Sequence, residues 1–143
     1  MGLPDENIAA DMYEVTQTIM QNAGFEAYEV SNHAAGDAAS HHNLIYWRGH
    51  DWIGVGPGAH GRFNIAGWRG ATETHLAPGL WLKAVMDGSG ESLRRNLSTD
   101  EAQAEKLMMG LRLNEGLSLA EHSNYIMKFK SLEDIGMLRL TSA

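Results

Sequence analysis

The 143-residue chain contains no cysteine, so disulfides, thiolate zinc sites and cysteine-bound iron–sulfur clusters are excluded within it. It has only 11 Lys and Arg against 18 Asp and Glu, and a net charge of −7 disfavours nonspecific binding to nucleic acid. It has no apolar run near the roughly 20 residues that a membrane span needs, and no signal-peptide pattern at its start. With 43% apolar residues, the composition predicts a globular protein of the cytoplasm.

The first third of the chain has the pattern of an α/β unit. An apolar stripe at helical spacing predicts a first helix, and it consists of Ile8, Met12, Val15 and Ile19. Pro4 and Asp5 suit the start of this helix, and Gly24 suits its end. Residues 25–30 then read as a short strand.

The middle of the chain is rich in glycine. Residues 52–55 are a second strand candidate that leads into the glycine-rich loop 54–61. Residues 62–73 indicate a hairpin or irregular β arm, and 75–87 a helix with Pro78 in its first turn, because proline in mid-helix is costly.

The last part of the chain reads as helical. Ser98 and Glu101 form a capping box that begins a helix expected to end at Gly116. Residues 119–137 are expected to form a further helical segment. The apolar residues expected to be buried are Ala104, Leu107, Met108 and Leu111 in the first helix, and Ile126, Phe129, Leu132 and Ile135 in the second.

Three segments could carry a site. In the loop 54–61, the glycines allow backbone amides to face a ligand, although a tight structural turn explains the same composition. In 41–50, His41, His42 and His50 could bind a metal or haem iron while Tyr46 and Trp47 cover a flat ligand. The alternative for this segment is a set of surface histidines beside a packed aromatic pair.

The third segment is YEVSNH, residues 28–33. Glu29 and Asn32 lie at the end of the expected strand, where α/β barrels place the groups that contact ligands. The alternative is a solvated carboxylate followed by a turn-forming asparagine.

Four stretches together resemble one family. They are YEVSNHA (28–34), HNLIYW (42–47), DWIGVGPGAHG (51–61) and LMMGLRLNEGLSL (107–119). In order and spacing they resemble the later part of radical-SAM proteins of the oxygen-independent coproporphyrinogen III oxidase family. The resemblance implies an α+β chain, with the end of an incomplete radical-SAM α/β barrel at 1–60, a β arm and connecting helix at 61–97, and a truncated, mostly helical domain at 98–143.

That family has two branches. One is an enzyme that oxidatively decarboxylates two propionates of coproporphyrinogen III to vinyl groups in porphyrin biosynthesis. The other is a haem-binding chaperone that delivers haem to a receiving protein. His42, Asn43, Tyr46 and Trp47 form an HN-x-x-YW pattern that resembles the chaperone branch more closely. We therefore expect a haem chaperone, with the oxidase as the alternative.

The resemblance also implies cofactors and their contacts. Residues matching the SAM side of the barrel are Gly54, Gly56, Gly58, Ala59, Glu29 and Asn32. Haem or a porphyrinogen is expected at His42, Tyr46 and Trp47, with His42 as the ligand of the haem iron. The family's 4Fe–4S cluster needs three cysteines that this chain lacks, so we expect a fragment inactive as an enzyme. An incomplete barrel leaves open strand edges and apolar faces, which predicts self-association.

Overall fold

The computed structural model describes residues 3–141. Met1, Gly2, Ser142 and Ala143, the outer ends of the expected segments 1–60 and 98–143, lie outside the described residues. In chain order, the described elements are α1 (Glu6–Asn22), β1 (Glu26–Glu29), β2 (Asn32–Ala34), α2 (His41–Trp47), β3 (His60–Ile65), β4 (Trp68–Thr74), α3 (Pro78–Met86), β5 (Glu91–Asn96), α4 (Thr99–Gly110), the 3-10 helix η1 (Leu119–Tyr125) and α5 (Ile126–Asp134).

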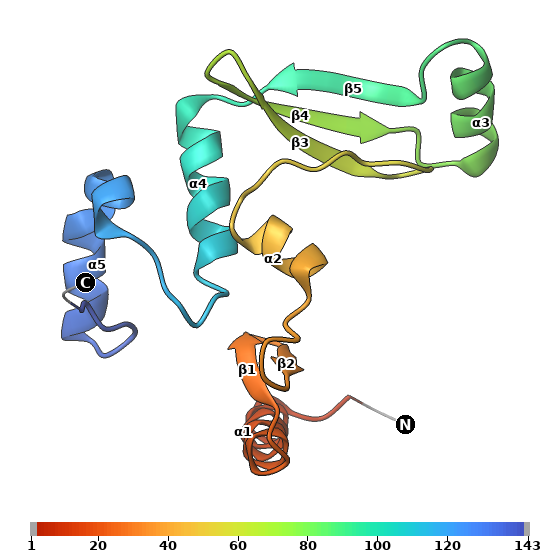
Figure 1. The fold of residues 1–143 in the computed structure, drawn as a ribbon. Helices are drawn as coiled ribbons and strands as arrows, with labels where there is room; N and C mark the ends of the chain where they lie inside the picture. Colours follow the sequence, from red (N-terminus) through yellow and green to blue (C-terminus); the bar gives the residue numbers. More distant parts are fainter. Residues whose placement is uncertain (1–2, 142–143) are drawn as a thin grey trace.

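The strands form two small antiparallel sheets. β1 pairs with β2, and β4 lies between β3 and β5. Figure 1 shows α1 beside the first sheet, the second sheet with α3 at its far end, and α2 and α4 between them. The chain is therefore α+β, as predicted. All strand pairs within residues 3–141 are antiparallel, whereas the strands of an α/β barrel are parallel. The barrel implied by the resemblance therefore stays a prediction.

Helix α1 begins and ends where the sequence predicts. The Asp5 carboxylate accepts a hydrogen bond from the backbone N–H of Ile8 at 2.9 Å, which is an N-cap. Gly24, at φ 81°, takes the left-handed conformation that stops the helix. The predicted apolar stripe is present but remains exposed, from 49% at Ile8 to 61% at Ile19.

The glycine-rich middle agrees with the prediction in its hairpin and differs from it in the elements before and after. Residues 52–55 are not a strand, because only Trp52 bridges β3, at Arg62. The predicted hairpin is confirmed as β3 and β4, which turn at Ala66 and Gly67. The predicted helix begins at Pro78 rather than at residue 75, since Pro78 occupies its first position. β5, which completes the sheet, was not foreseen.

The capping box of α4 is confirmed. The Ser98 side chain accepts from the backbone N–H of Glu101 at 3.2 Å, and the Glu101 carboxylate accepts from the backbone N–H of Ser98 at 2.8 Å. The helix ends at Gly110 rather than Gly116, and the buried Gly110 lies against the Leu117 side chain, which leaves no room for a Cβ there.

The predicted burial of the C-terminal helices is mostly wrong. Met108 and Leu111 are exposed, Ala104 is exposed and Leu107 is half-buried. Of the four residues expected to be buried in the second helical segment, Phe129 is buried, and Ile126, Leu132 and Ile135 are exposed. An apolar stripe is buried only where another element covers it, and the described elements leave most of these two faces uncovered.

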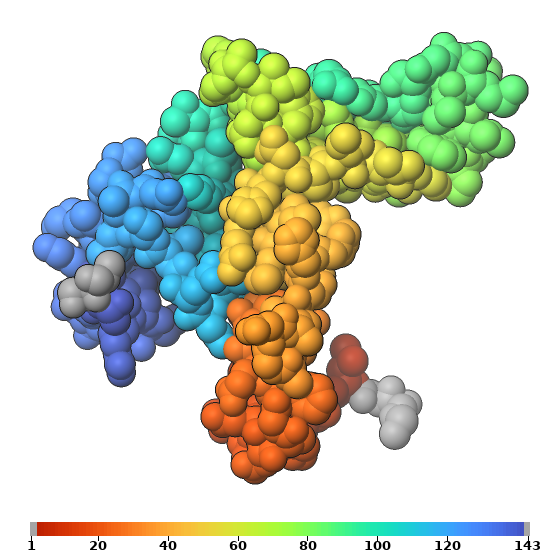
Figure 2. All heavy atoms as spheres, in the orientation of Figure 1, coloured from red at the N-terminus to blue at the C-terminus, as the bar shows by residue number. Residues whose placement is uncertain are grey.

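The molecule is open rather than centred on one core. Its buried apolar side chains are Ala34, Ala71, Leu97, Leu113 and Phe129 among the described residues. Figure 2 shows the N-terminal, sheet and C-terminal parts projecting separately from the middle of the molecule. No helix within residues 3–141 is both long and apolar enough to span a membrane.

Candidate functional site

The HNLIYW segment forms a short capped helix. The Ser40 hydroxyl accepts from the backbone N–H of Asn43 at 3.3 Å and begins α2. Residues four apart lie on one helix face, so His42 stands beside Tyr46. Their rings meet edge to face with centroids 4.8 Å apart, and Tyr46 meets Trp52 in the same way at 4.8 Å. These three residues, His42, Tyr46 and Trp52, form a continuous aromatic row.

Trp52 anchors this aromatic row to the second sheet. Its backbone N–H donates to the Arg62 carbonyl at 2.7 Å, and its indole N–H donates to the His60 carbonyl at 3.1 Å. The guanidiniums of Arg62 and Arg69 lie 5.8 and 5.5 Å from its ring centroid, within cation–π range. Sequence reasoning did not select Trp52, although its place directly before the glycine-rich loop was a usable signal.

Trp47 does not join the aromatic row. It follows Tyr46 by one residue, which turns its side chain about 100° around the helix. The Arg112 guanidinium lies 4.3 Å from the Trp47 ring centroid. Of the three predicted haem contacts, the structure therefore brings His42 and Tyr46 together and directs Trp47 to another part of the molecule. His42 itself is exposed, so its imidazole is accessible to a ligand.

Arg112 connects Trp47 to a buried carboxylate. The guanidinium of Arg112 donates to one oxygen of Glu29 at 3.1 and 2.8 Å. The other oxygen accepts from the backbone N–H of Ser31 at 2.9 Å, from its hydroxyl at 2.8 Å and from the Asn32 amide. We call Glu29, Ser31, Asn32 and Arg112 the Glu29 cluster. It fixes the end of β1 to the segment after α4.

The Glu29 cluster keeps its carboxylate charged. Glu29 is fully buried, and burial raises the pKa of its carboxyl. The hydrogen bonds from Ser31, Asn32 and Arg112 outweigh that effect and lower the pKa from 4.5 to about 2. Both carboxylate oxygens already have donors within the chain. The structure thus gives Glu29 and Asn32 an internal bonding role, and their contact with SAM stays a prediction.

The glycine-rich loop is held to the second sheet by Thr74. The Thr74 hydroxyl donates to the Gly56 carbonyl at 2.6 Å and accepts from the backbone N–H of Ala59 at 2.8 Å. The backbone N–H of Gly58 donates to the His75 carbonyl at 3.0 Å. The amides of Gly58 and Ala59 are thus used inside the chain, and their role toward SAM stays a prediction.

Gly54 and Gly56 are required by the local backbone. At Gly54, a Cβ would collide with the carbonyl of His60, so the loop can lie against β3 only without a side chain there. Gly56 has φ 109°, which other residues rarely adopt. Between them, Val55 is 83% exposed, so this face of the loop is open.

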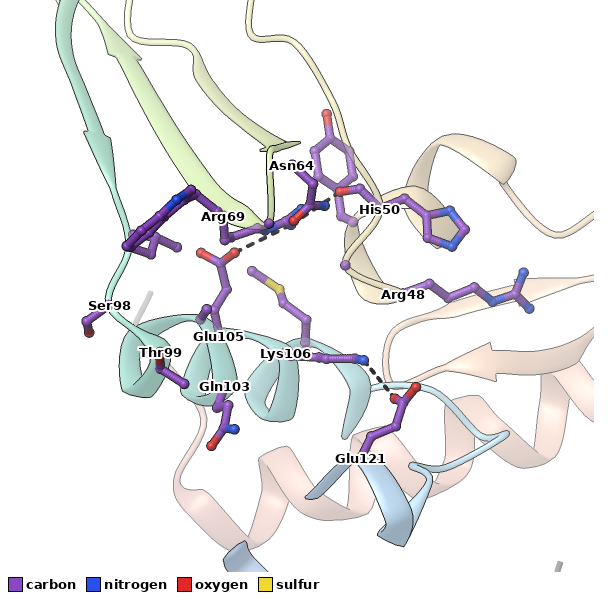
Figure 3. A pocket seen from close by; sticks show the side chains of 17 residues that line it. Arg48, His50, Asn64, Arg69, Ser98, Thr99, Gln103, Glu105, Lys106 and Glu121 are labelled. Carbon is purple, nitrogen blue, oxygen red and sulfur yellow. Dashed lines mark hydrogen bonds and ion pairs between the residues drawn. The ribbon is translucent and has the colours of Figure 1, made fainter. Parts of the chain in front are cut away.

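A groove lies between the end of α2, the β3–β4 hairpin and α4. Its cavity has a volume of about 830 Å³, and Tyr46 of the aromatic row forms part of its wall. Figure 3 shows Arg48 and His50 on the segment after α2 with their side chains directed away from α4, Arg69 on the hairpin, and Lys106 on α4 beside Glu121. The groove thus joins an aromatic wall to three cationic side chains, Arg48, Arg69 and Lys106, and to two carboxylates, Glu105 and Glu121.

The described residues hold no cluster of three or more His, Asp or Glu side chains that could enclose a metal ion. His42 fits a haem iron, because it is exposed and its ring lies against an aromatic neighbour that can contact a flat macrocycle.

The chain matches known proteins over most of its length. It is 43% identical over 124 residues to the mitochondrial radical S-adenosyl methionine domain-containing protein 1 of Danio rerio, covering 82% of this chain and 28% of the relative. It is 32% identical over 120 residues to the haem chaperone HemW of Mycobacterium tuberculosis, covering 84% of this chain and 30% of the relative. The haem chaperone HemW of Bacillus subtilis is 33% identical over 121 residues, covering 82% of this chain and 30% of that relative.

No protein-family model and no solved structure matches the chain. The chain spans less than a third of the length of the curated relatives it matches. Over that span, the chain is similar both to radical S-adenosyl methionine domain-containing protein 1 and to HemW, which confirms the resemblance carried by its motifs. The chain belongs to the HemW-like family of radical-SAM proteins.

Proposed function

We propose that this chain supplies the haem-binding surface of a radical-SAM-related haem chaperone. The observation that carries the proposal is the aromatic row, in which the exposed His42 lies against Tyr46, and Tyr46 in turn lies against Trp52. An accessible imidazole can bind haem iron, and an adjacent aromatic edge can contact the porphyrin ring. Relatives named haem chaperone, in three bacteria among others, favour this function over coproporphyrinogen oxidation.

The proposal assigns His42 the iron and Tyr46 the porphyrin edge. Trp47 then supports the helix from its other side through Arg112 rather than contacting haem directly. Haem would supply the iron centre that is delivered to a receiving protein. The residues of this chain bind and orient it.

The remaining radical-SAM features rest on the resemblance alone. The barrel, the three segments 1–60, 61–97 and 98–143, and the contacts to SAM belong to this part of the proposal. The chain contains no cysteine, so its residues do not fit a 4Fe–4S cluster, and we derive no chemical step from one. A cytoplasmic location is likewise proposed, although relatives named as mitochondrial exist.

A haem titration with a matched pair of variants tests the proposal. We expect a saturable shift of the Soret band in the unmodified chain, lost in His42→Ala. The control is His41→Ala, because His41 is the adjacent exposed residue of the same helix and lies outside the aromatic row. Equal haem affinity of His42→Ala and the unmodified chain would contradict the assignment.

A second experiment separates the chaperone from the oxidase. A full-length protein of this family is expressed in a strain that lacks coproporphyrinogen oxidase. We expect no rescue of growth if the protein only carries haem. Rescue would show that the family member performs the decarboxylation.

A further inference from the structure

The groove beside the aromatic row has the chemistry of a carboxylate-binding site. Arg48 and Lys106 line it from different elements, the end of α2 and the middle of α4. Tyr46 stands in the same wall and also touches His42, at 4.8 Å between ring centroids. Tyr46 is therefore shared by the groove and the aromatic row, although His42 itself is not among the residues that line the groove.

The two cations are held by carboxylates that a ligand can replace. Lys106 donates to Glu121 at 2.7 Å, and Arg48 donates to Glu115 at 2.9 and 2.8 Å. The side chains of the Lys106–Glu121 pair are 46% and 56% exposed. Exposed ion pairs of this kind contribute little to stability, so exchanging one carboxylate for another costs little.

Arg69 differs from these two cations, although it lines the same groove. Its side chain is only 13% exposed and is shared between Asp51, at 3.0 Å, and Glu105, at 3.7 Å. It also lies over the Trp52 ring. Arg69 thus belongs to the framework that holds Trp52, and Lys106 and Arg48 are the cations available to a ligand.

We propose that this groove binds the carboxylate side chains of the tetrapyrrole whose iron His42 holds, with Lys106 as the principal partner and Arg48 as the second. This inference rests on the proposed haem function. Haem carries two propionates on one edge of a flat ring, and the groove offers two cations beside an aromatic wall. A carboxylate of the ligand takes the place of Glu121 at Lys106, and no covalent bond changes.

The test compares two ligands and two opposed variants in the full 143-residue chain. The ligands are ferric haem and its dimethyl ester, which keeps the iron and the ring but has no carboxylates. Lys106→Gln is expected to weaken haem binding roughly three- to fivefold and to leave the ester unchanged. Glu121→Gln removes the competing carboxylate, so it is expected to tighten haem binding by a similar factor and again leave the ester unchanged.

The opposite signs separate ligand contact from simple loss of structure. Both variants break the same Lys106–Glu121 ion pair, so a purely structural role would change haem binding in the same direction in both. Lys83→Gln on α3, outside the groove, is the control and should bind both ligands normally.

The outcomes distinguish this inference from the proposed function. If haem binds through His42 but Lys106→Gln affects haem and ester equally, or affects neither, the carboxylate site is overturned while haem binding stands. If the unmodified chain binds neither ligand, the haem function and this inference both fail.

Discussion

The Glu29 cluster allows a quantitative prediction about how the end of β1 is joined to the segment after α4. The substitution is Glu29→Gln, which keeps the side-chain shape and removes the charge. The carboxyl pKa of about 2 lies below its ordinary 4.5. Each unit of pKa corresponds to about 1.4 kcal/mol, so the lowered pKa corresponds to about 3 kcal/mol at neutral pH. This free energy favours the folded contact between β1 and the segment after α4. Glutamine also leaves the Arg112 guanidinium without its counter-charge.

The pH dependence of this contribution follows from the direction of the pKa change. Because the folded state has the lower pKa, the unfolded state binds more protons between pH 4.5 and about 2. The stabilisation is therefore complete above pH 4.5 and is lost as the pH falls through about 2. Glu29→Gln should abolish this dependence, since no titrating group remains at the position.

Hydrogen exchange of single amides measures the junction directly. The backbone N–H of Val30 donates to the Arg112 carbonyl at 3.1 Å, so its exchange reports opening at this point. A loss of about 3 kcal/mol accelerates exchange by roughly two orders of magnitude. The control is Glu26→Gln, an exposed position on the same strand. An effect no larger than that of the control, or an unchanged pH dependence, would refute the reasoning.

Three further predictions test the fold. Ser98→Ala removes the α4 cap and should cost about 1 kcal/mol of stability, measured by denaturant unfolding followed by circular dichroism; unchanged stability would contradict it. Gly54→Ala should displace the glycine-rich loop, because the new Cβ would meet the His60 carbonyl, whereas Gly79→Ala has open space around it and should leave the loop in place. The NMR chemical shift of the Trp52 indole N–H compares the two variants. Equal changes in that shift would count against the contact. The exposed α1 stripe predicts self-association, which Val15→Lys should weaken in light scattering; a monomeric unmodified chain at high concentration would contradict this.

Local signals in the sequence predicted the ends of several elements. Asp5 and Gly24 bound α1, Pro78 begins α3, and Ser98 with Glu101 begins α4. Each of these signals acts through backbone groups within a few residues, so no knowledge of distant contacts was needed.

Long-range contacts decided what the sequence did not predict. Glu29 could be read as a solvated carboxylate because its partner Arg112 lies 83 residues away. The helical state of α2 was not foreseen either, since its seven residues are too few for a helical period, and it is supported by the Asn43 amide donating to Tyr28 and by Arg112 over Trp47. The apolar period likewise showed which face of α1 is apolar but not whether another element covers it.

The arrangement of α2 links the proposed haem surface to the junction of the chain. One side of this helix presents His42 and Tyr46, and another places Trp47 against Arg112, which neutralises Glu29. A helix of two turns has little stability of its own, so its orientation depends on these contacts. Loss of Arg112 would therefore leave the Glu29 carboxylate with Ser31 and Asn32 as its donors, and would remove the cation that lies over Trp47 on the helix that carries His42. On this argument the HN-x-x-YW pattern is one structural unit, in which the histidine and tyrosine face the ligand and the tryptophan fixes their position.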